Sequence, residues 1–264
     1  MAFLAVPGPF DFALTTERFR AFGVDRVNLW HEGGLHRVVG GREVRIEAAE
    51  GGVEVDPLDA ETEPVVRRLL GLPFDLDGFS AWAAEDDVLA GIVPRLAGFR
   101  PPLTPDPFEM LVGAIAAQQV SLFSATAIRN RLIERFGVRA ANAWAFPTRE
   151  RLAAAGEDEL VALGFSRRKS EYVVGLARSR LDLAALVSLP DDEVRARIVA
   201  LRGLGEWTAE WFLARHLGRP HAWPAGDLAL RKAVAPLDVD QARIRFHPYE
   251  NLSAHYLLLS KRVP

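Results

Sequence analysis

Two short segments of the sequence hold residues whose types and spacing could do chemistry. Residues 201–209 read Leu-Arg-Gly-Leu-Gly-Glu-Trp-Thr-Ala, and Asp227 ends the segment Trp-Pro-Ala-Gly-Asp further along. Gly203 and Gly205, one residue apart, permit a tight turn with positive φ and leave backbone N–H groups free. Such N–H groups at the start of a following helix can bind an anion such as a phosphate. We therefore expect an anion site at this turn.

The residues around this turn support two interpretations. Thr208 is placed to cap the following helix or to contact a phosphate, and Asp227 directly precedes a predicted helix over 228–234. The positive end of that helix favours the ionised carboxylate. The plainer alternative is an ordinary helix–helix turn followed by an N-cap aspartate. The succession of turn and carboxylate favours chemistry, because it places a carboxylate next to a phosphate anchor.

Aromatic side chains accompany the turn. Trp207 and Trp211 are four residues apart, so they lie on one face of the predicted helix over 206–217. For any single Trp at this spacing, packing in the core is the default explanation. Their π faces could alternatively hold a flat cationic ligand.

The elements that must position these residues change character along the chain. From Asp106 onwards the apolar residues repeat with the helical period; Asp106 is a candidate N-cap, Pro107 the first helical residue, and Glu109 the partner of a capping box. Further helices are predicted over 122–136, 148–155, 158–163, 167–180, 191–199, 206–217 and 228–234.

The N-terminal part is predicted to be strand-rich. Short alternating runs over 26–30, 35–40, 43–48 and 52–55 are separated by glycine pairs typical of hairpin turns. Helices are expected over 16–22 and 61–70, against one face of the sheet. Prolines between 94 and 107 mark the boundary to the helical part. We interpret the N-terminal part as a scaffold without a role in chemistry.

Composition excludes several classes of site. The 264 residues are 49% hydrophobic and 25% charged, as in an ordinary globular protein, and they include no Cys and six His. Disulfides, iron–sulfur clusters and thiolate zinc sites are excluded, and no His pair has ligand spacing. Residues 1–100 carry a net charge of −7, whereas residues 101–264 carry +4. A polyanionic partner would therefore meet the C-terminal part. With neither a leader-like nor a membrane-spanning segment, we expect a cytoplasmic protein.

Together these motifs resemble the helix-hairpin-helix DNA glycosylases, named also for a Gly/Pro-rich loop ending in Asp, and within them the bacterial 3-methyladenine DNA glycosylase II (AlkA) group. The similarity also covers residues 108–121, 146–155, 162–164 and 207–209. It implies an α+β fold with an N-terminal antiparallel sheet domain and two all-helical domains. The implied division is 1–75, then 103–222 with the hairpin, then 76–102 together with 223–264.

The resemblance implies a role for each candidate residue. Asp227 would be the catalytic carboxylate of a monofunctional N-glycosylase that flips out alkylated purines. Trp207, Trp211 and Tyr249 would line the base pocket, with Trp211 and Tyr249 the better candidates and Trp207 partly structural. Gln118 would also contact the substrate.

Contacts to damaged double-stranded DNA are implied for Gly203, Gly205, Thr208 and Gln119. Gln119 occupies the turn that enters the minor groove in the family, where AlkA has Leu, so it could instead bond to the orphaned partner base. Arg167, Arg168 and Lys169 are further candidates for phosphate contact.

The family also bears on cofactors. Relatives that cut the strand have a Lys in the hairpin's second helix, where this chain has Glu206 and Trp207, which favours simple hydrolysis without a catalytic cofactor. A monovalent cation could be held by the backbone carbonyls of Val199, Leu201 and Leu204. We expect a monomer that has no contact with membranes.

Three alternatives stay open. A non-catalytic helix-hairpin-helix DNA-binding protein needs the glycines but neither Asp227 nor an aromatic pocket. A glycosylase for deaminated or oxidised bases would use the same Asp227 with a pocket for neutral bases. A helical protein-interaction scaffold would need none of these features.

Overall fold

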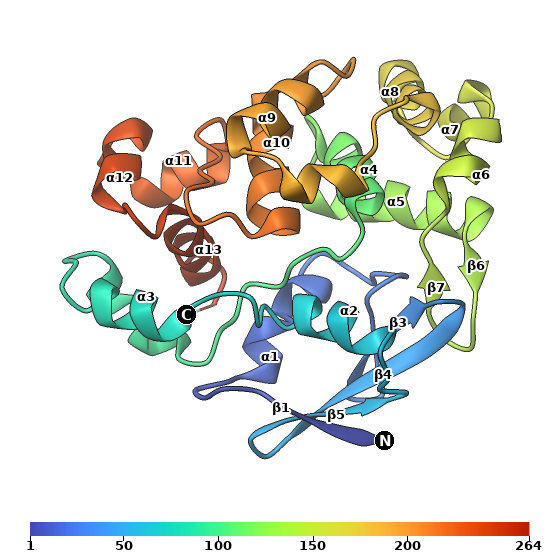
Figure 1. Cartoon of the computed structure of the whole chain (residues 1–264). Helices are drawn as coiled ribbons and strands as arrows, with labels where there is room; N and C mark the ends of the chain where they lie inside the picture. Colours follow the sequence, from blue (N-terminus) through green and yellow to red (C-terminus); the bar gives the residue numbers. More distant parts are fainter. Residues whose placement is uncertain (264) are drawn as a thin grey trace.

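A five-stranded antiparallel sheet forms the N-terminal part of the computed structural model, which describes residues 1–263 (Figure 1). Its strands are β1 (Ala2–Ala5), β2 (Leu29–His31), β3 (Gly34–Val39), β4 (Arg42–Ala49) and β5 (Gly52–Asp56), in the order β1-β5-β4-β3-β2. Leu35 pairs with Ile46, and Ile46 pairs with Val55, so fully buried aliphatic side chains face one another across three strands. The predicted sheet is confirmed, and β1 is an additional strand that was not predicted.

The helical part follows the predicted pattern closely. The helices are α1 (Phe12–Thr15), α2 (Thr62–Leu69), α3 (Leu76–Ala83), α4 (Pro107–Ala117), α5 (Leu122–Phe136), α6 (Arg149–Ala154), α7 (Glu157–Ala162), α8 (Arg167–Arg178), α9 (Asp191–Val199), α10 (Glu206–Phe212), α11 (Leu228–Val234), α12 (Val239–Arg245) and α13 (Glu250–Ser260). The short η segments are η1 (Glu17–Phe19), η2 (Leu89–Gly91), η3 (Pro94–Leu96), η4 (Ala184–Ser188) and η5 (Leu213–Leu217). The predictions over 122–136, 191–199 and 228–234 are confirmed residue for residue.

Other predictions were wrong in detail. The helix expected over 16–22 is instead α1 followed by the short turn η1, because Asp11 caps a start at Phe12. The helix expected over 206–217 changes to the wider π form at Leu213 and ends at Gly218 with a φ of 68°. A two-stranded ribbon, β6 (Val138–Arg139) with β7 (Trp144–Ala145), interrupts the central part that was expected to be all-helical.

Buried side chains form three cores. One belongs to the sheet and α2, and its buried members lie between residues 4 and 70. The second takes its members from 108–222, around the hairpin, and the third combines 74–103 with 223–259. We propose that each core corresponds to one of the three domains expected from the sequence.

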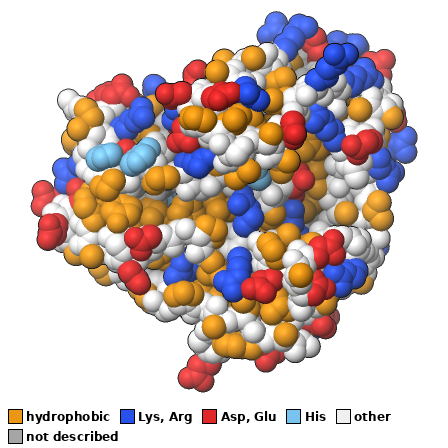
Figure 2. Space-filling model, in the orientation of Figure 1, with side chains coloured by type: hydrophobic (Ala, Val, Ile, Leu, Met, Phe, Trp, Pro, Cys, Tyr) orange, Lys and Arg blue, Asp and Glu red, His pale blue; other side chains and the backbone are white. Residues whose placement is uncertain are grey.

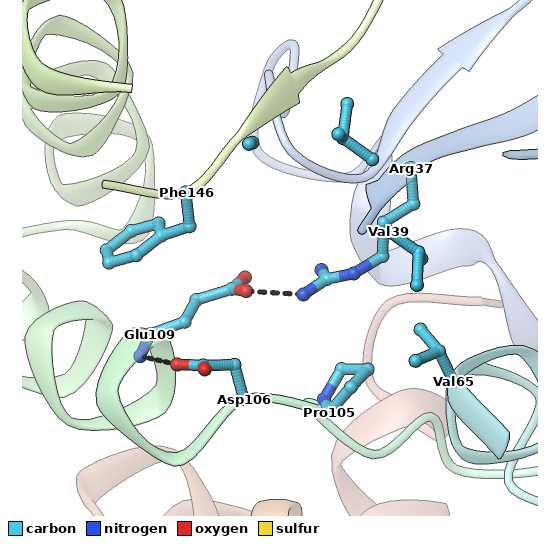
Figure 3. Close-up of a pocket in the computed structure, with 9 residues that line it drawn as sticks. Arg37, Val39, Val65, Pro105, Asp106, Glu109 and Phe146 are labelled. Atoms are coloured by element: carbon cyan, nitrogen blue, oxygen red, sulfur yellow. Dashed lines mark hydrogen bonds and ion pairs between the residues drawn. The ribbon is translucent and has the colours of Figure 1, made fainter. Parts of the chain in front are cut away.

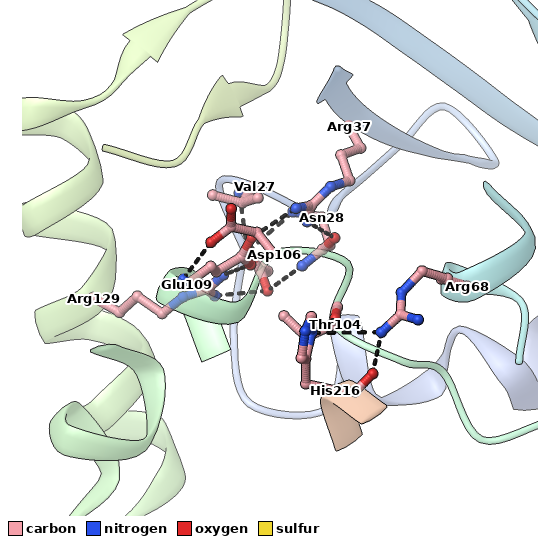
Figure 4. A network of polar contacts seen from close by, with 10 residues as sticks. Val27, Asn28, Arg37, Arg68, Thr104, Asp106, Glu109, Arg129 and His216 are labelled. Atoms are coloured by element: carbon pink, nitrogen blue, oxygen red, sulfur yellow. Dashed lines mark hydrogen bonds and ion pairs between the residues drawn. The ribbon is translucent and has the colours of Figure 1, made fainter. Parts of the chain in front are cut away.

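A buried network of ion pairs joins the sheet to the helical part (Figure 4). Glu109 of α4 accepts hydrogen bonds from Arg37 of β3 at 2.6 Å and from Arg129 of α5 at 2.8 Å. Arg129 also pairs with Asp25 at 2.9 Å. Asp106 does cap α4 by accepting from the Glu109 N–H at 2.6 Å, but the capping box is wrong, because the Glu109 carboxylate is engaged by the two arginines. No helix within residues 1–263 is long and apolar enough to cross a bilayer.

Candidate active site

The two carboxylate oxygens of Asp227 accept hydrogen bonds from different helices: one oxygen from α11 and the other from α10. Oδ1 caps α11 by accepting from the N–H groups of Ala229 at 2.9 Å and Leu230 at 3.1 Å. Oδ2 accepts from the indole Nε1 of Trp207 and of Trp211, each at 3.0 Å. Four N–H donors thus hold this half-buried carboxylate and fix the plane of the group.

The local sequence explains why these groups meet. Trp207 and Trp211 stand one turn apart on α10, so both indole N–H groups point to the same side of that helix. Glu210, on the same helix, accepts from the backbone N–H of Trp223 at 2.8 Å and from Arg195 of α9 at 2.5 Å. The loop that carries Asp227 is therefore tied to both helices of the hairpin.

The hairpin turn depends on one glycine conformation. Gly203 has a φ of 85°, and a Cβ there would lie 2.2 Å from the ring of Tyr172 on α8. Gly205 is different: it is the extended N-cap of α10, and a Cβ there would meet nothing within 4 Å. Gly203 thus supplies the positive φ expected for this turn, and the open surroundings of Gly205 leave room for a bulky anion.

Two predicted contact residues are engaged inside the protein. The side-chain amide of Gln118 donates to the carbonyl of Gly203 at 2.8 Å, so in this structure it braces the hairpin rather than facing a substrate. Thr208 is 1% exposed, so its side chain does not reach the surface as a phosphate ligand would need to. The backbone N–H groups of Gly205, Glu206 and Trp207 donate no hydrogen bond within residues 1–263, so they are available to an anion.

The aromatic residues are arranged differently from the expectation. Trp211 is only 2% exposed, and the Arg215 guanidinium covers its ring at 3.5 Å from the centroid. Trp207 is half-buried, which makes it the more accessible indole. Tyr249 packs with Trp82 at 5.5 Å between ring centroids, within the third core, and within residues 1–263 no hydrogen bond joins it to Asp227. In this structure Trp207 is thus the more accessible of the two indoles, and the assignment of Trp211 and Tyr249 to a base pocket stays a prediction.

The turn between α4 and α5 projects from the surface. Gln119 is exposed and has a φ of 55°, an unusual value for a residue other than glycine. Beyond it Val120, Leu122 and Phe123 are 40%, 47% and 62% exposed. Sequence reasoning named Gln119 alone and missed this exposed apolar set, because three apolar residues at the start of a predicted helix resemble core residues.

Positive charge gathers beside this turn. Figure 2 shows Lys and Arg side chains clustered on the face over α6, α7 and α8. Arg167 and Arg168 are exposed at the start of α8, as expected for phosphate contacts. Lys169 is buried and donates to the carbonyl of Ala116 at 2.9 Å, and burial lowers its pKa, so its assignment to phosphate binding was wrong.

Two cavities of about 310 Å³ each lie away from Asp227. Figure 3 shows the first, between the sheet and α4, where Arg37 donates a hydrogen bond to Glu109 and where Asp106 and Phe146 are further lining residues. The second lies beside α3 and Tyr256. Neither is lined by Asp227 or by its two indoles, so the candidate active site is defined by its hydrogen bonds.

The hairpin carbonyls suit a cation in part. The oxygens of Val199 and Leu204 accept no hydrogen bond within residues 1–263, whereas that of Leu201 accepts from the Leu204 N–H at 3.1 Å. Two of the three predicted ligands thus lack any other partner.

Comparison with known proteins identifies the family. The model of the HhH-GPD superfamily of base excision DNA repair proteins matches residues 112–251, which include the hairpin and Asp227. The chain belongs to the HhH-GPD superfamily. The chain is 31% identical to the DNA-3-methyladenine glycosylase of Bacillus subtilis over 64% of this chain and 58% of that protein. It is also 31% identical to DNA-3-methyladenine glycosylase 2 of Escherichia coli, over 67% of this chain and 60% of the relative.

These alignments span less than two thirds of each relative's length. A solved structure extends the likeness over nearly the whole chain: the 3-methyladenine DNA glycosylase from Archaeoglobus fulgidus superposes with a TM-score of 0.87 at 26% identity, covering 99% of this chain and 98% of that one. The predicted fold class is confirmed in its sheet and its helical part.

Proposed function

We propose that this protein is a monofunctional DNA glycosylase that hydrolyses the N-glycosidic bond of a damaged base, with an alkylated purine of the 3-methyladenine type as substrate. The observation that carries the proposal is the Asp227 carboxylate, held by two indole N–H groups and two backbone N–H groups beside the hairpin. Relatives named DNA-3-methyladenine glycosylase support the substrate class.

The mechanism follows from the charge that develops during the reaction. Departure of the base leaves positive charge on the deoxyribose, and a fixed carboxylate below C1′ stabilises that charge and can orient water. Because four donors already hold Asp227, its reorientation adds little to the barrier. An N3- or N7-alkylated base is cationic and leaves as a neutral group without an acid catalyst.

The position of Trp207 favours hydrolysis over strand cleavage. A lyase reaction needs an amine nucleophile close to C1′, and the second helix of the hairpin offers Glu206 and Trp207 instead. Lys232, on α11, is the nearest Lys in sequence to the hairpin, and neither α9 nor α10 contains a Lys. We therefore expect an abasic site as the product.

DNA binding would use the hairpin amides as one phosphate anchor and the exposed apolar turn as the wedge. The unpaired N–H groups of Gly205, Glu206 and Trp207 would meet a backbone phosphate without a side-chain charge. A monovalent cation on the carbonyls of Val199 and Leu204 would add positive charge there. Duplex DNA carrying the damaged base is the proposed partner.

A second candidate substrate class is favoured by one observation. The guanidinium of Arg215 covers the ring of Trp211. Burial lowers the pKa of Arg215, and the nearby positive charges of Arg18 and Arg262 act in the same direction. A guanidinium this close to an indole that holds Asp227 opposes a cationic base nearby and favours a neutral base with hydrogen-bond acceptors, such as a deaminated or oxidised purine. A non-catalytic DNA-binding protein would not need the indole contacts to Asp227.

A substrate panel tests the proposal. Matched duplexes carrying 3-methyladenine, 7-methylguanine, hypoxanthine or 8-oxoguanine are incubated with excess enzyme, and free base and strand breaks are measured separately. Release of alkylpurines with intact strands supports the main proposal. Release of hypoxanthine or 8-oxoguanine alone supports the second candidate, and binding of all four duplexes without release of any base contradicts both.

A further inference from the structure

Two histidines and a buried glutamate converge on one point away from the candidate active site. The two Nδ1 atoms lie 3.1 Å from separate oxygens of Glu250: that of His221 from Oε2 and that of His247 from Oε1. The two imidazole rings stack at 5.1 Å between centroids with an interplanar angle of 19°. Figure 2 shows two neighbouring His side chains on the side of the molecule where α11 and α12 lie.

The charge of Glu250 is not balanced by a permanent cation. The residue is 4% exposed at the start of α13, and within residues 1–263 its only ion-pair partners are these two histidines. Arg219, on the same loop as His221, pairs with Asp191 instead, and Arg245 pairs with Asp86. A buried carboxylate needs a cationic partner, and a neutral imidazole does not provide one.

The spacing of the three groups suits a metal ion. One ligand atom from each residue lies within 4.8 Å of the other two. Metal–ligand bonds of 2.0–2.2 Å around a tetrahedral zinc ion place neighbouring ligands roughly 3.3–3.6 Å apart. The two Nδ1–oxygen distances, each to a different oxygen of Glu250, are 3.1 Å and so lie close to that spacing. The histidine side chains are 48% and 65% exposed, so an ion can enter from solvent and keep open positions for water.

We propose that His221, His247 and Glu250 form a binding site for one divalent transition-metal ion of the Zn²⁺ and Co²⁺ class. A set of two imidazoles and one carboxylate binds ions of this class in preference to Mg²⁺ or Ca²⁺, which favour ligand sets made of oxygen atoms. The site is structural. It joins the loop before Asp227 to the first turn of α13, where the Asn251 N–H already donates to the carbonyl of Pro220 at 3.0 Å.

Metal titration of the full chain tests the site. The protein, free of any His tag, is stripped with chelator and titrated with Co²⁺ while the visible d–d absorption is followed, and its melting temperature is measured with and without Zn²⁺. We expect one Co²⁺ per chain. At a Zn²⁺ concentration a hundredfold above its Kd, we expect a rise in melting temperature of about 5 °C or more.

Two variants at exposed positions decide the outcome. His221→Ala and His247→Ala should each weaken Co²⁺ binding by at least roughly tenfold, because loss of a residue that only supports a metal ligand already costs that much. Circular dichroism checks that both variants fold. His31→Ala, a partly exposed histidine on β2, is the matched control and should bind as the wild type does. Absence of stoichiometric Co²⁺ absorption in the wild type, or equal affinity in all four proteins, overturns the proposal. Neither result depends on base release.

Discussion

The indole Nε1 of Trp211 lies 3.0 Å from Asp227 Oδ2, the oxygen that does not cap α11. The carboxylate thus connects two helices: one oxygen completes the first turn of α11, and the other is held from α10 by Trp211 together with Trp207. In a glycosylase this arrangement would keep the carboxylate oriented before the substrate arrives, so that little reorganisation accompanies the chemical step.

Removal of either indole N–H should slow base release. Trp207→Phe and Trp211→Phe each delete one hydrogen bond to a charged group, worth about 1.5–3 kcal/mol, so we expect the single-turnover rate to fall by about tenfold to a hundredfold. Affinity for DNA should stay close to that of the wild type. Trp144→Phe, on β7, is the control for the same chemical change away from Asp227. Equal rates in all four proteins would remove the indoles from this role.

The two glycines of the hairpin should behave differently. In Gly203→Ala the new Cβ meets the ring of Tyr172 at 2.2 Å in a left-handed conformation, so the free energy of unfolding should drop by about 2 kcal/mol or more. Gly205→Ala has space and an extended backbone, so its stability should change by less than about 1 kcal/mol. Its affinity for DNA should nevertheless fall, because the methyl group stands where a phosphate would approach.

Urea denaturation and fluorescence anisotropy with a short duplex separate the two effects. Normal DNA affinity in Gly205→Ala would argue against a phosphate at the hairpin amides.

The exposed turn before α5 should matter for duplex DNA only. Phe123→Ser removes a side chain that is 62% exposed, so the melting temperature should hardly change. Base release from duplex DNA should decrease severalfold if the ring supports the flipped-out state, whereas release from single strands should not. Gln119→Gly removes the side-chain amide while glycine tolerates the φ of 55°, so base release from duplex DNA by this variant tests the role of the amide. Unchanged duplex activity in both variants would exclude the turn as the wedge.

Stability should fall in mildly acidic solution because of a buried histidine. Burial lowers the pKa of His216 to about 4, although the hydrogen bond with the Thr104 carbonyl acts in the opposite direction. An unfolded histidine has a pKa of about 6.5. Between these values the unfolded chain takes up a proton and the folded one does not, so the stabilisation present above pH 6.5 is lost as the pH falls towards 4.

The size of this contribution is up to roughly 3 kcal/mol. His216→Gln should therefore flatten the dependence of unfolding free energy on pH between 6.5 and 4, whereas His31→Gln should leave it unchanged. Burial also lowers the pKa of His255, so part of the dependence of unfolding free energy on pH should remain in His216→Gln. The Glu43 carboxyl contributes only at lower pH: burial raises its pKa, but hydrogen bonds from Ala143 and Asn142 outweigh this and bring it to about 2. An identical slope in His216→Gln and the wild type would refute the assignment.

Helix boundaries in the C-terminal part could be predicted because local signals mark them. Ser121 and Asp227 accept hydrogen bonds from the first turns of α5 and α11, and these caps are legible in the sequence. Strand β1 could not be found in the same way. Its pairing with β5 joins residues 2–5 to 52–55, and a four-residue run with one buried side chain carries no clear period.

The candidate site was predictable where it depends on residue type and not where it depends on tertiary contacts. Asp227 and the hairpin could be located from their motif. The burial of Trp211 beneath Arg215, and the use of Gln118 to brace Gly203, arise from helices packed against each other. The cluster of His221, His247 and Glu250 was missed because ligand spacing was sought between His residues within single segments. His247 and Glu250 are three residues apart, but His221 joins them only through the fold.

The most direct test of the account is the single-turnover rate of 3-methyladenine release from an alkylated duplex by the wild type and by Asp227→Asn, with DNA affinity measured on the same samples. The variant preserves the volume of the side chain and its cap on α11. We predict that release falls by at least about a hundredfold while the Kd for DNA changes less than about threefold. Equal release by the two proteins would contradict the central role of the Asp227 carboxylate.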